Sequence, residues 1–292
     1  MTRNDEKGIL GIRIITSSGL PIYKQVWSEK IAGFESKDQT LQAGFMTAIL
    51  NFAKEMKHHV GFIRFYSEND NDEKEFQLSY GIDALVSLRE NIVFILFLEP
   101  YIFKNRVELK IDWIYDLIIK NYNDQINKGE KIKFTEEEEE KIRNILFDNK
   151  ARRYINKRSK KLKKIIKKKI HKQFSHENIL GIAICSFDNS ILYTYLIEIE
   201  DLEDYLNNMG LITRIKEWEC QYKPIWLPIP DKDPVLVSVI NSAMQVPIIP
   251  GIDNENLKIP YFYYLVSDQD ALLGPLTESL LQGINPFFLE KE

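Results

Sequence analysis

The strongest constraint on the fold is a short motif that opens two similar stretches of the sequence. The run Ile9-Leu10-Gly11-Ile12 returns as Ile179-Leu180-Gly181-Ile182. Each copy leads into an alternating apolar strand, a short polar turn, a second strand that contains tyrosine, and then a helical pattern. Repetition of a whole order of elements indicates one supersecondary unit built twice. The sequence therefore predicts two modules of mixed α/β (α+β) class, each an antiparallel sheet with flanking helices.

The first module has a definite predicted order of elements. Runs of β-branched and aromatic residues, separated by turn residues, indicate a hairpin over 8–27 and strands over 60–67, 76–80 and 92–98. Apolar residues at three- and four-residue spacing indicate a helix that begins near Asp38 and another over 109–127. The strand 92–98 is apolar on both faces, so we expect it at the centre of the sheet.

The second module repeats this order. After the hairpin that begins at Ile179, the sequence predicts a helix, three strands and a final helix, over 201–218, 225–229, 234–240, 259–266 and 271–282. With 292 residues the chain has the length of two ordinary domains. We expect the modules to span 8–130 and 178–290, with a helical linker over 131–177.

The linker combines a helical pattern with a steep change of charge. Thr135 and Glu138 fit a capping box, and neither glycine nor proline interrupts the pattern from there to Phe174. The linker starts with the acidic run Glu136–Glu140, whereas Lys150–Lys172 holds 13 Lys or Arg and no Asp or Glu. Because the net charge of the whole chain is −4, the rest of the protein is acidic. This asymmetry predicts a polyanionic partner or pairing between the two blocks.

The order of elements resembles that of longin and roadblock domains, and the style of sequence is similar to longin-like proteins encoded in Asgard archaeal genomes. The resemblance is carried by four runs: 9–15 (ILGIRII), 19–23 (GLPIY), 41–45 (LQAGF) and 94–97 (FILF). It implies a non-catalytic adaptor or scaffold that binds small GTPases or other trafficking-type protein partners. It also implies, as an alternative, a subunit of a GTPase exchange-factor complex. Open strand edges make a homodimer an expected assembly.

The basic half of the linker is the sharpest candidate site. An apolar ridge of isoleucine and leucine recurs within it near helical spacing, surrounded by cations, which is typical of a helix lying on an anionic membrane. The same charge suits the phosphates of RNA or DNA, although no aromatic residues are interleaved before Phe174. A third interpretation is a linker whose ridge packs on the sheets while the lysines remain in water. The candidate residues are Lys157, Arg158, Lys160, Lys161, Lys163, Lys164, Lys167, Lys168, Lys169 and Lys172.

A second, apolar candidate lies on the helix expected after Asp38. Leu41, Phe45, Ile49 and Phe52 form one stripe. Core packing on the sheet is the ordinary role of such a stripe, and a partner groove beside it is the alternative.

The remaining sequence argues against catalysis and against a resident cofactor or metal. There is no phosphate-binding glycine loop followed by Lys-Ser or Lys-Thr and no Gly-x-Ser-x-Gly elbow. Cys185 and Cys220 are too far apart in sequence for a zinc motif, and we expect Cys185 in the core. Five consecutive glutamates point all around a helix, so we do not expect them to converge on one ion. The polar amino terminus predicts a cytoplasmic protein, with the basic helix as a possible route to peripheral membrane attachment.

Overall fold

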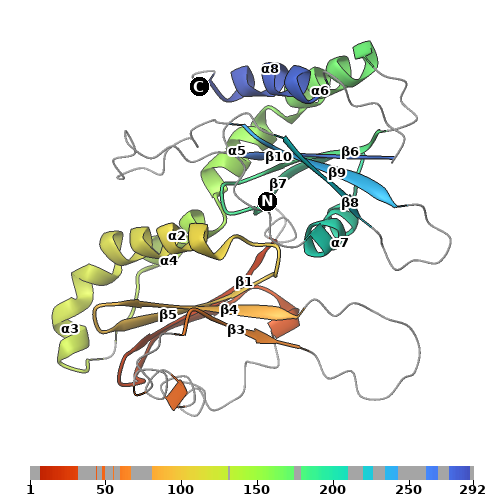
Figure 1. Cartoon of the computed structure of the whole chain (residues 1–292). Helices are drawn as coiled ribbons and strands as arrows, with labels where there is room; N and C mark the ends of the chain where they lie inside the picture. The colour runs from red at the N-terminus through yellow and green to blue at the C-terminus, as the bar shows by residue number, and fades with distance from the viewer. Residues whose placement is uncertain are drawn as a thin grey trace. The chain divides into compact units, whose positions relative to one another are not determined.

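The computed structural model divides the chain into two compact units, Met1–Phe147 (unit 1) and Asp148–Glu292 (unit 2), and each is described by itself. Figure 1 shows the elements of both. The structure describes residues 7–31, 44, 48–49, 55, 60–66, 81–130, 132–173, 179–209, 220–225, 234–242, 261–268 and 276–289.

Unit 1 contains a five-stranded antiparallel sheet in the order β2-β1-β5-β4-β3. Its strands are β1 (Ile9–Thr16), β2 (Pro21–Val26), β3 (Phe62–Phe65), β4 (Ile82–Arg89) and β5 (Ile92–Leu98). Its helices are α2 (Lys104–Leu117), the 3-10 helix η3 (Ile119–Tyr122), α3 (Asn123–Asn127) and α4 (Glu136–Leu146). As the apolar run predicts, β5 lies in the middle of the sheet.

Unit 2 contains a second five-stranded antiparallel sheet, in the order β7-β6-β10-β9-β8. Its strands are β6 (Ile179–Cys185), β7 (Ile191–Tyr195), β8 (Cys220–Ile225), β9 (Val235–Asn241) and β10 (Phe262–Asp268). Its helices are α5 (Asn149–Lys157), α6 (Ser159–Gln173), α7 (Ile199–Met209) and α8 (Leu276–Leu289). Helices α6 and α8 run side by side over one face of the sheet, and α7 lies on the other (Figure 1). The predicted mixed α/β class with antiparallel sheets is confirmed.

The repeated glycine of the opening motif has the same structural role in both units. A Cβ atom on Gly11 would lie 2.6 Å from Cδ1 of Ile31, and one on Gly181 would lie 2.5 Å from Cβ of Ile197. Each of these isoleucines follows the second strand of its sheet. At Gly181 a side chain would collide with the base of Ile197, and at Gly11 it would displace the terminal methyl of Ile31 and crowd the Gln25 carbonyl oxygen at 3.0 Å, so glycine suits both places where the chain folds back over the first strand.

The linker predicted as one continuous helical segment consists of three helices, so its predicted continuity is wrong. The first break lies at Phe147–Asp148, where Asp148 adopts a left-handed conformation with φ 51°. The Asp148 carboxylate is buried and accepts a hydrogen bond from the hydroxyl of Ser186 in the β6–β7 turn. The second break lies at Arg158, between α5 and α6. Contacts made within the folded unit therefore override local helix propensity here.

Other predicted elements agree in kind and differ in their bounds. The strand predicted over 76–80 lies outside the described residues, and the alternating strand β4 that follows was not predicted. Helix α8 continues to Leu289 past Pro286, which is exposed, because Phe287 and Phe288 are buried against the core. Strand β8 ends at Ile225, where the sequence predicted a strand to begin.

Candidate polyanion-binding face

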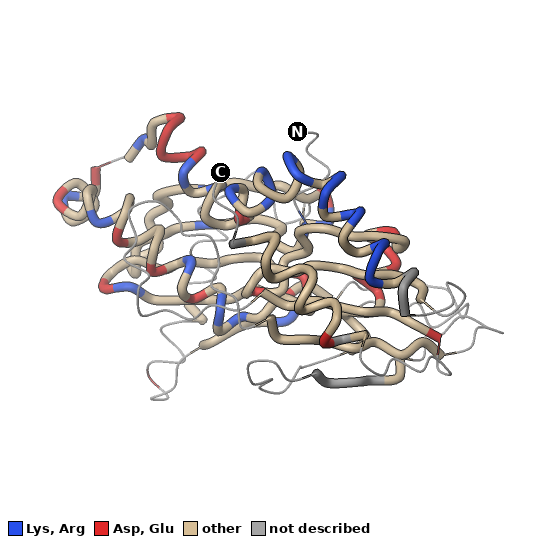
Figure 2. The backbone as a smooth tube through the Cα atoms, turned by 90° about the horizontal axis from the view of Figure 1, so that it is seen from above, with Lys and Arg blue, Asp and Glu red and all other residues tan. Residues whose placement is uncertain are grey.

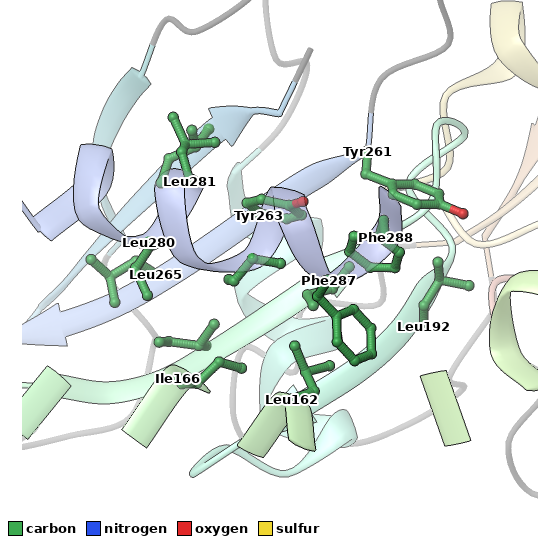
Figure 3. Packing of buried hydrophobic residues seen from close by; sticks show 14 of the residues in the cluster. Leu162, Ile166, Leu192, Tyr261, Tyr263, Leu265, Leu280, Leu281, Phe287 and Phe288 are labelled. Atoms are coloured by element: carbon green, nitrogen blue, oxygen red, sulfur yellow. The ribbon is translucent and has the colours of Figure 1, made fainter. Parts of the chain in front are cut away.

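The apolar ridge of the basic segment belongs to the core of unit 2. Leu162 and Ile166 are 0% exposed and Ile170 is 1% exposed. They pack in a cluster with residues of β6, β10 and α8, and Figure 3 shows Leu162 and Ile166 reaching from α6 toward α8 and the sheet. Of the three interpretations of this ridge, burial supports packing on the sheet. In this fold the ridge is not available for insertion into a bilayer.

Burial of the ridge turns the charged half of α6 toward solvent. We call the lysine face the six exposed lysines of this helix, which are Lys160, Lys161, Lys163, Lys164, Lys167 and Lys168. At roughly 100° per residue these positions cover about half of the helix circumference, opposite the buried ridge. Neither α5 nor α6 contains an acidic residue. Figure 2 colours Lys and Arg blue, and blue positions follow one another along the helices of this basic segment.

The other predicted cations occupy different environments. Lys157 is exposed at the end of α5, whereas Arg158 and Lys169 are half-buried, and the side chain of Lys172 lies outside the described residues. The Arg158 guanidinium lies 4.2 Å from the ring centre of Tyr154, which suits a cation–π contact. The Lys169 stem lies against α8, since a Cβ on Gly283 would be 2.9 Å from its Cε.

Helix α6 is held in place by its neighbours, so the lysine face has a fixed backbone. The Tyr154 hydroxyl of α5 donates a 2.5 Å hydrogen bond to the carbonyl oxygen of Phe287 in α8. The rings of Tyr154 and Phe287 meet edge to face at 5.5 Å. Gly283 allows α8 to approach Ile165 and Lys169 of α6 closely. The cations are therefore presented together on a packed surface.

The apolar stripe predicted in unit 1 is described only in part. Leu41, Phe45 and Phe52 lie outside the described residues. Ile49 is helical and packs, partly buried, against an apolar cluster that includes Ile15 of β1. Ile49 thus takes the core-packing role, and the partner groove remains a prediction.

A pocket that was not predicted lies in unit 1, between α4 and the face of β2. It has a volume of about 190 Å³, and its lining residues are Tyr23, Gln25, Trp27, Glu136, Glu139, Glu140 and Arg143. Tyr23 and Gln25 alternate along β2, Trp27 directly follows the strand, and the four helix residues follow i, i+3, i+4, i+7 spacing. Three of the five glutamates of the run therefore line one pocket, although among the described residues no three acidic, His or Cys side chains are grouped to hold a metal ion. The spacing of Glu136, Glu139 and Glu140 in the sequence already predicts that these three side chains share one side of the helix.

The remaining two glutamates of the run have other roles. Glu138 closes a capping box with Thr135 and accepts a hydrogen bond from the Tyr122 hydroxyl. Burial acts to raise the pKa of Glu138, but hydrogen bonds from Thr135 and Tyr122 outweigh it and the pKa is lowered. Glu137 is exposed and does not line the pocket. The start of α4 is thus fixed by its cap while three carboxylates face the pocket.

Two residues of types that catalytic sites use, Cys185 and Asp83, lie in buried structural environments. Cys185 is 0% exposed, and burial raises the pKa of its thiol far above the ordinary value, as expected of a core cysteine. Asp83 is also buried, and it pairs with Arg64 and Lys104 at 2.5 Å each. Burial alone would raise the pKa of Asp83, but the hydrogen bonds from these two cations lower it. Among the described residues, no three His, Cys, Asp or Glu side chains are grouped to hold a metal ion.

Comparison with models of known protein families and with curated proteins finds no match to this chain. Within the described part of the chain, no helix has the length and apolar character to cross a bilayer.

Proposed function

We propose that this protein is a non-catalytic adaptor that attaches to anionic membrane surfaces through the lysine face of α6. The observation that carries the proposal is the division of α6 into a buried apolar half and an exposed half made of lysine. Because the ridge is used for packing, attachment is electrostatic and peripheral, without insertion of the helix.

The available charge is sufficient for reversible attachment. Each basic residue held near a negatively charged leaflet contributes roughly 1 kcal/mol. If half of the six lysines engage at once, the attraction is about 3 kcal/mol, which is roughly a hundredfold in affinity. This attraction acts over a Debye length of about 8 Å at physiological salt, so added salt should release the protein.

The adaptor part of the proposal rests on the repeated architecture. In unit 2, two strands are followed by α7, three strands and α8, and this is the order on which the resemblance to longin and roadblock domains is based. The sheet of unit 1 has the same strand order. These features support assignment of both units to that fold group. The group's partner class, small GTPases, is the partner we propose.

The membrane part is tested with two charge-matched variants. In the first, Lys160, Lys164, Lys167 and Lys168 of the lysine face are changed to Glu. In the control, four exposed lysines of unit 1 are changed to Glu, namely Lys120, Lys128, Lys133 and Lys141. Four reversals of two charges each take both variants from a net charge of −4 to −12.

The readout is co-sedimentation with vesicles that contain phosphatidylserine. The first variant should lose binding by up to roughly a hundredfold, because the attraction of about 3 kcal/mol from the lysine face is removed. The control should retain most of its binding, apart from a weaker long-range repulsion. Equal binding by the two variants would show that the lysine face is not the attachment site. Binding of the parent protein to RNA but not to vesicles would select the nucleic-acid alternative.

The partner class is tested separately by capture of purified small GTPases, loaded with GDP or with GTP, on the immobilised full chain. Capture that depends on the bound nucleotide is the expected result. Failure with both nucleotide states would remove the GTPase part of the proposal and leave the membrane part unaffected.

A further inference from the structure

We propose that the pocket between α4 and β2 is a binding site for the cationic end of an Arg or Lys side chain on an extended segment of a partner protein. This site lies in unit 1 and is independent of the lysine face. Its ligand chemistry follows from the charge, the aromatic rings and the size of the pocket. The position of the pocket beside the edge strand of the sheet indicates how the ligand is presented.

The charge of the lining favours a cation. Glu136, Glu139 and Glu140 supply three carboxylates against the single guanidinium of Arg143, which leaves the lining at −2. The negative charge is concentrated on one stripe of α4 and faces the aromatic residues of β2. A guanidinium or ammonium group in the pocket would form charge-assisted hydrogen bonds with these carboxylates.

The aromatic residues favour an organic cation over a metal ion. Tyr23 and Trp27 line the pocket beside the carboxylates, and indole and phenol rings attract cations through their faces. Among the described residues, no three Asp, Glu, His or Cys side chains are grouped to hold a metal ion, and this includes the three carboxylates of the pocket. The mixed lining therefore suits a cation that is carried on an apolar stem.

The volume of the pocket favours a single side chain. At about 190 Å³ it is smaller than the roughly 300–1,000 Å³ of clefts that hold drug-sized ligands. It is also open to the surface, so a long side chain can enter while its backbone remains outside.

The aromatic walls are already in position. The Tyr23 ring packs 5.2 Å from the ring of Phe134, and Trp27 meets Phe147 edge to face at 5.0 Å. Burial, together with the nearby negative charge of Glu139, raises the pKa of Tyr23 to about 12, so its hydroxyl stays neutral at physiological pH. A pocket formed in advance reduces the entropy lost when a ligand binds.

The position of β2 indicates how the side chain would be presented. β2 is the terminal strand of its sheet, and among the described residues no strand pairs with its outer edge. An extended segment can add to such an edge through main-chain hydrogen bonds, while alternate side chains enter pockets. Tyr23 and Gln25 alternate along β2, and Trp27 continues the same spacing just past the end of the strand, as this binding mode requires.

The test uses the full chain and a synthetic five-residue peptide, Val-Arg-Val-Arg-Val, capped at both ends. The comparison peptide carries citrulline at both arginine positions, which keeps the shape of the side chain and removes its charge. Binding is followed by isothermal titration and by the NMR signal of the Trp27 indole N–H, which reports on the pocket wall directly.

The protein variants separate the pocket from general acidity. The triple variant Glu136→Gln, Glu139→Gln, Glu140→Gln should bind the arginine peptide at least about tenfold more weakly, because charge-assisted contacts are lost. Glu137→Gln is the control, since Glu137 is exposed on the same helix and lies outside the pocket. Thermal unfolding of both variants checks that α4 remains folded.

The expected result is binding of the arginine peptide to the parent and to the Glu137→Gln protein, a shift of the Trp27 signal, and weak binding of the citrulline peptide. The proposal is overturned if the arginine peptide does not bind, if both peptides bind equally, or if the triple variant binds as well as the parent. It is also overturned if the parent alone forms a dimer that the triple variant does not, because a second copy would then be the occupant.

Discussion

Replacement of Ile166 by alanine tests whether the ridge of α6 is a core element. The Ile166 side chain is 0% exposed and belongs to the cluster that joins α6 to β6, β10 and α8. An Ile→Ala change at a fully buried site costs about 2–5 kcal/mol, from lost burial and from the cavity that remains. We therefore expect unit 2 to be destabilised by an amount in this range.

Native-state hydrogen exchange measures the effect in unit 2 alone, which matters because the two units need not unfold together. A loss of 2–5 kcal/mol corresponds to exchange that is roughly 30- to 5,000-fold faster for the amides of β6 and β10. Lys164→Ala is the control. Its exposed side chain lies on the same helix, and surface changes of this kind usually alter stability by less than about 0.5 kcal/mol.

A core role for the ridge would be contradicted if Ile166→Ala and Lys164→Ala gave the same exchange rates in β6 and β10. The ridge would then contribute nothing to the fold, and it would be free to enter a membrane. Insertion of the ridge would replace the purely electrostatic attachment proposed above.

Three further predictions concern the scaffold. Gly181→Ala should destabilise unit 2 by about 1–3 kcal/mol, seen as faster exchange in β6, because the new Cβ would lie 2.5 Å from Cβ of Ile197. Tyr154→Phe should cost about 1–3 kcal/mol in the same assay, because the carbonyl of Phe287 loses its 2.5 Å hydrogen bond; an unchanged rate would contradict this. The lowered pKa of Asp83 means that its ion pairs stabilise unit 1 above the ordinary value of 3.8 and that this stability is lost as pH falls below it. Urea unfolding from pH 5 to pH 2 should therefore show a smaller decrease for Asp83→Asn than for the parent, and equal decreases would refute the assignment.

Sequence patterns were most informative where periodicity and burial coincide. Strand β1 and the central strand β5 follow from largely apolar runs that are buried in the sheet, whereas the edge strand β2 is only partly buried. The ridge of α6 follows from its helical spacing, although the sequence left open whether a membrane or the protein covers it. Its burial against α8 depends on residues more than a hundred positions away in the chain.

The missed features depend on contacts that local patterns do not contain. Strand β4 interrupts its apolar residues with Asp83, Ser87 and Arg89, and buried Asp83 is tolerated because Arg64 and Lys104 lie beside it. The break before α5 depends on the hydrogen bond between Asp148 and Ser186.

The acidic pocket depends on helical geometry that a run of five consecutive charges conceals. The helix directs each glutamate to a side set by its position in the run. Glu136, Glu139 and Glu140 share one side, where β2 supplies the aromatic half of the pocket. The glutamate spacing is visible in the sequence, but the pairing of α4 with β2 is not.

The measurement that tests the account most directly is the partition of the unmodified protein onto vesicles with and without anionic lipid, over a series of salt concentrations. Attachment through the lysine face predicts binding to anionic vesicles that falls steeply as salt rises, and no binding to neutral vesicles. Binding that is equal on the two kinds of vesicle, or that does not respond to salt, would contradict electrostatic attachment. Failure to bind anionic vesicles at low salt would contradict the membrane function itself.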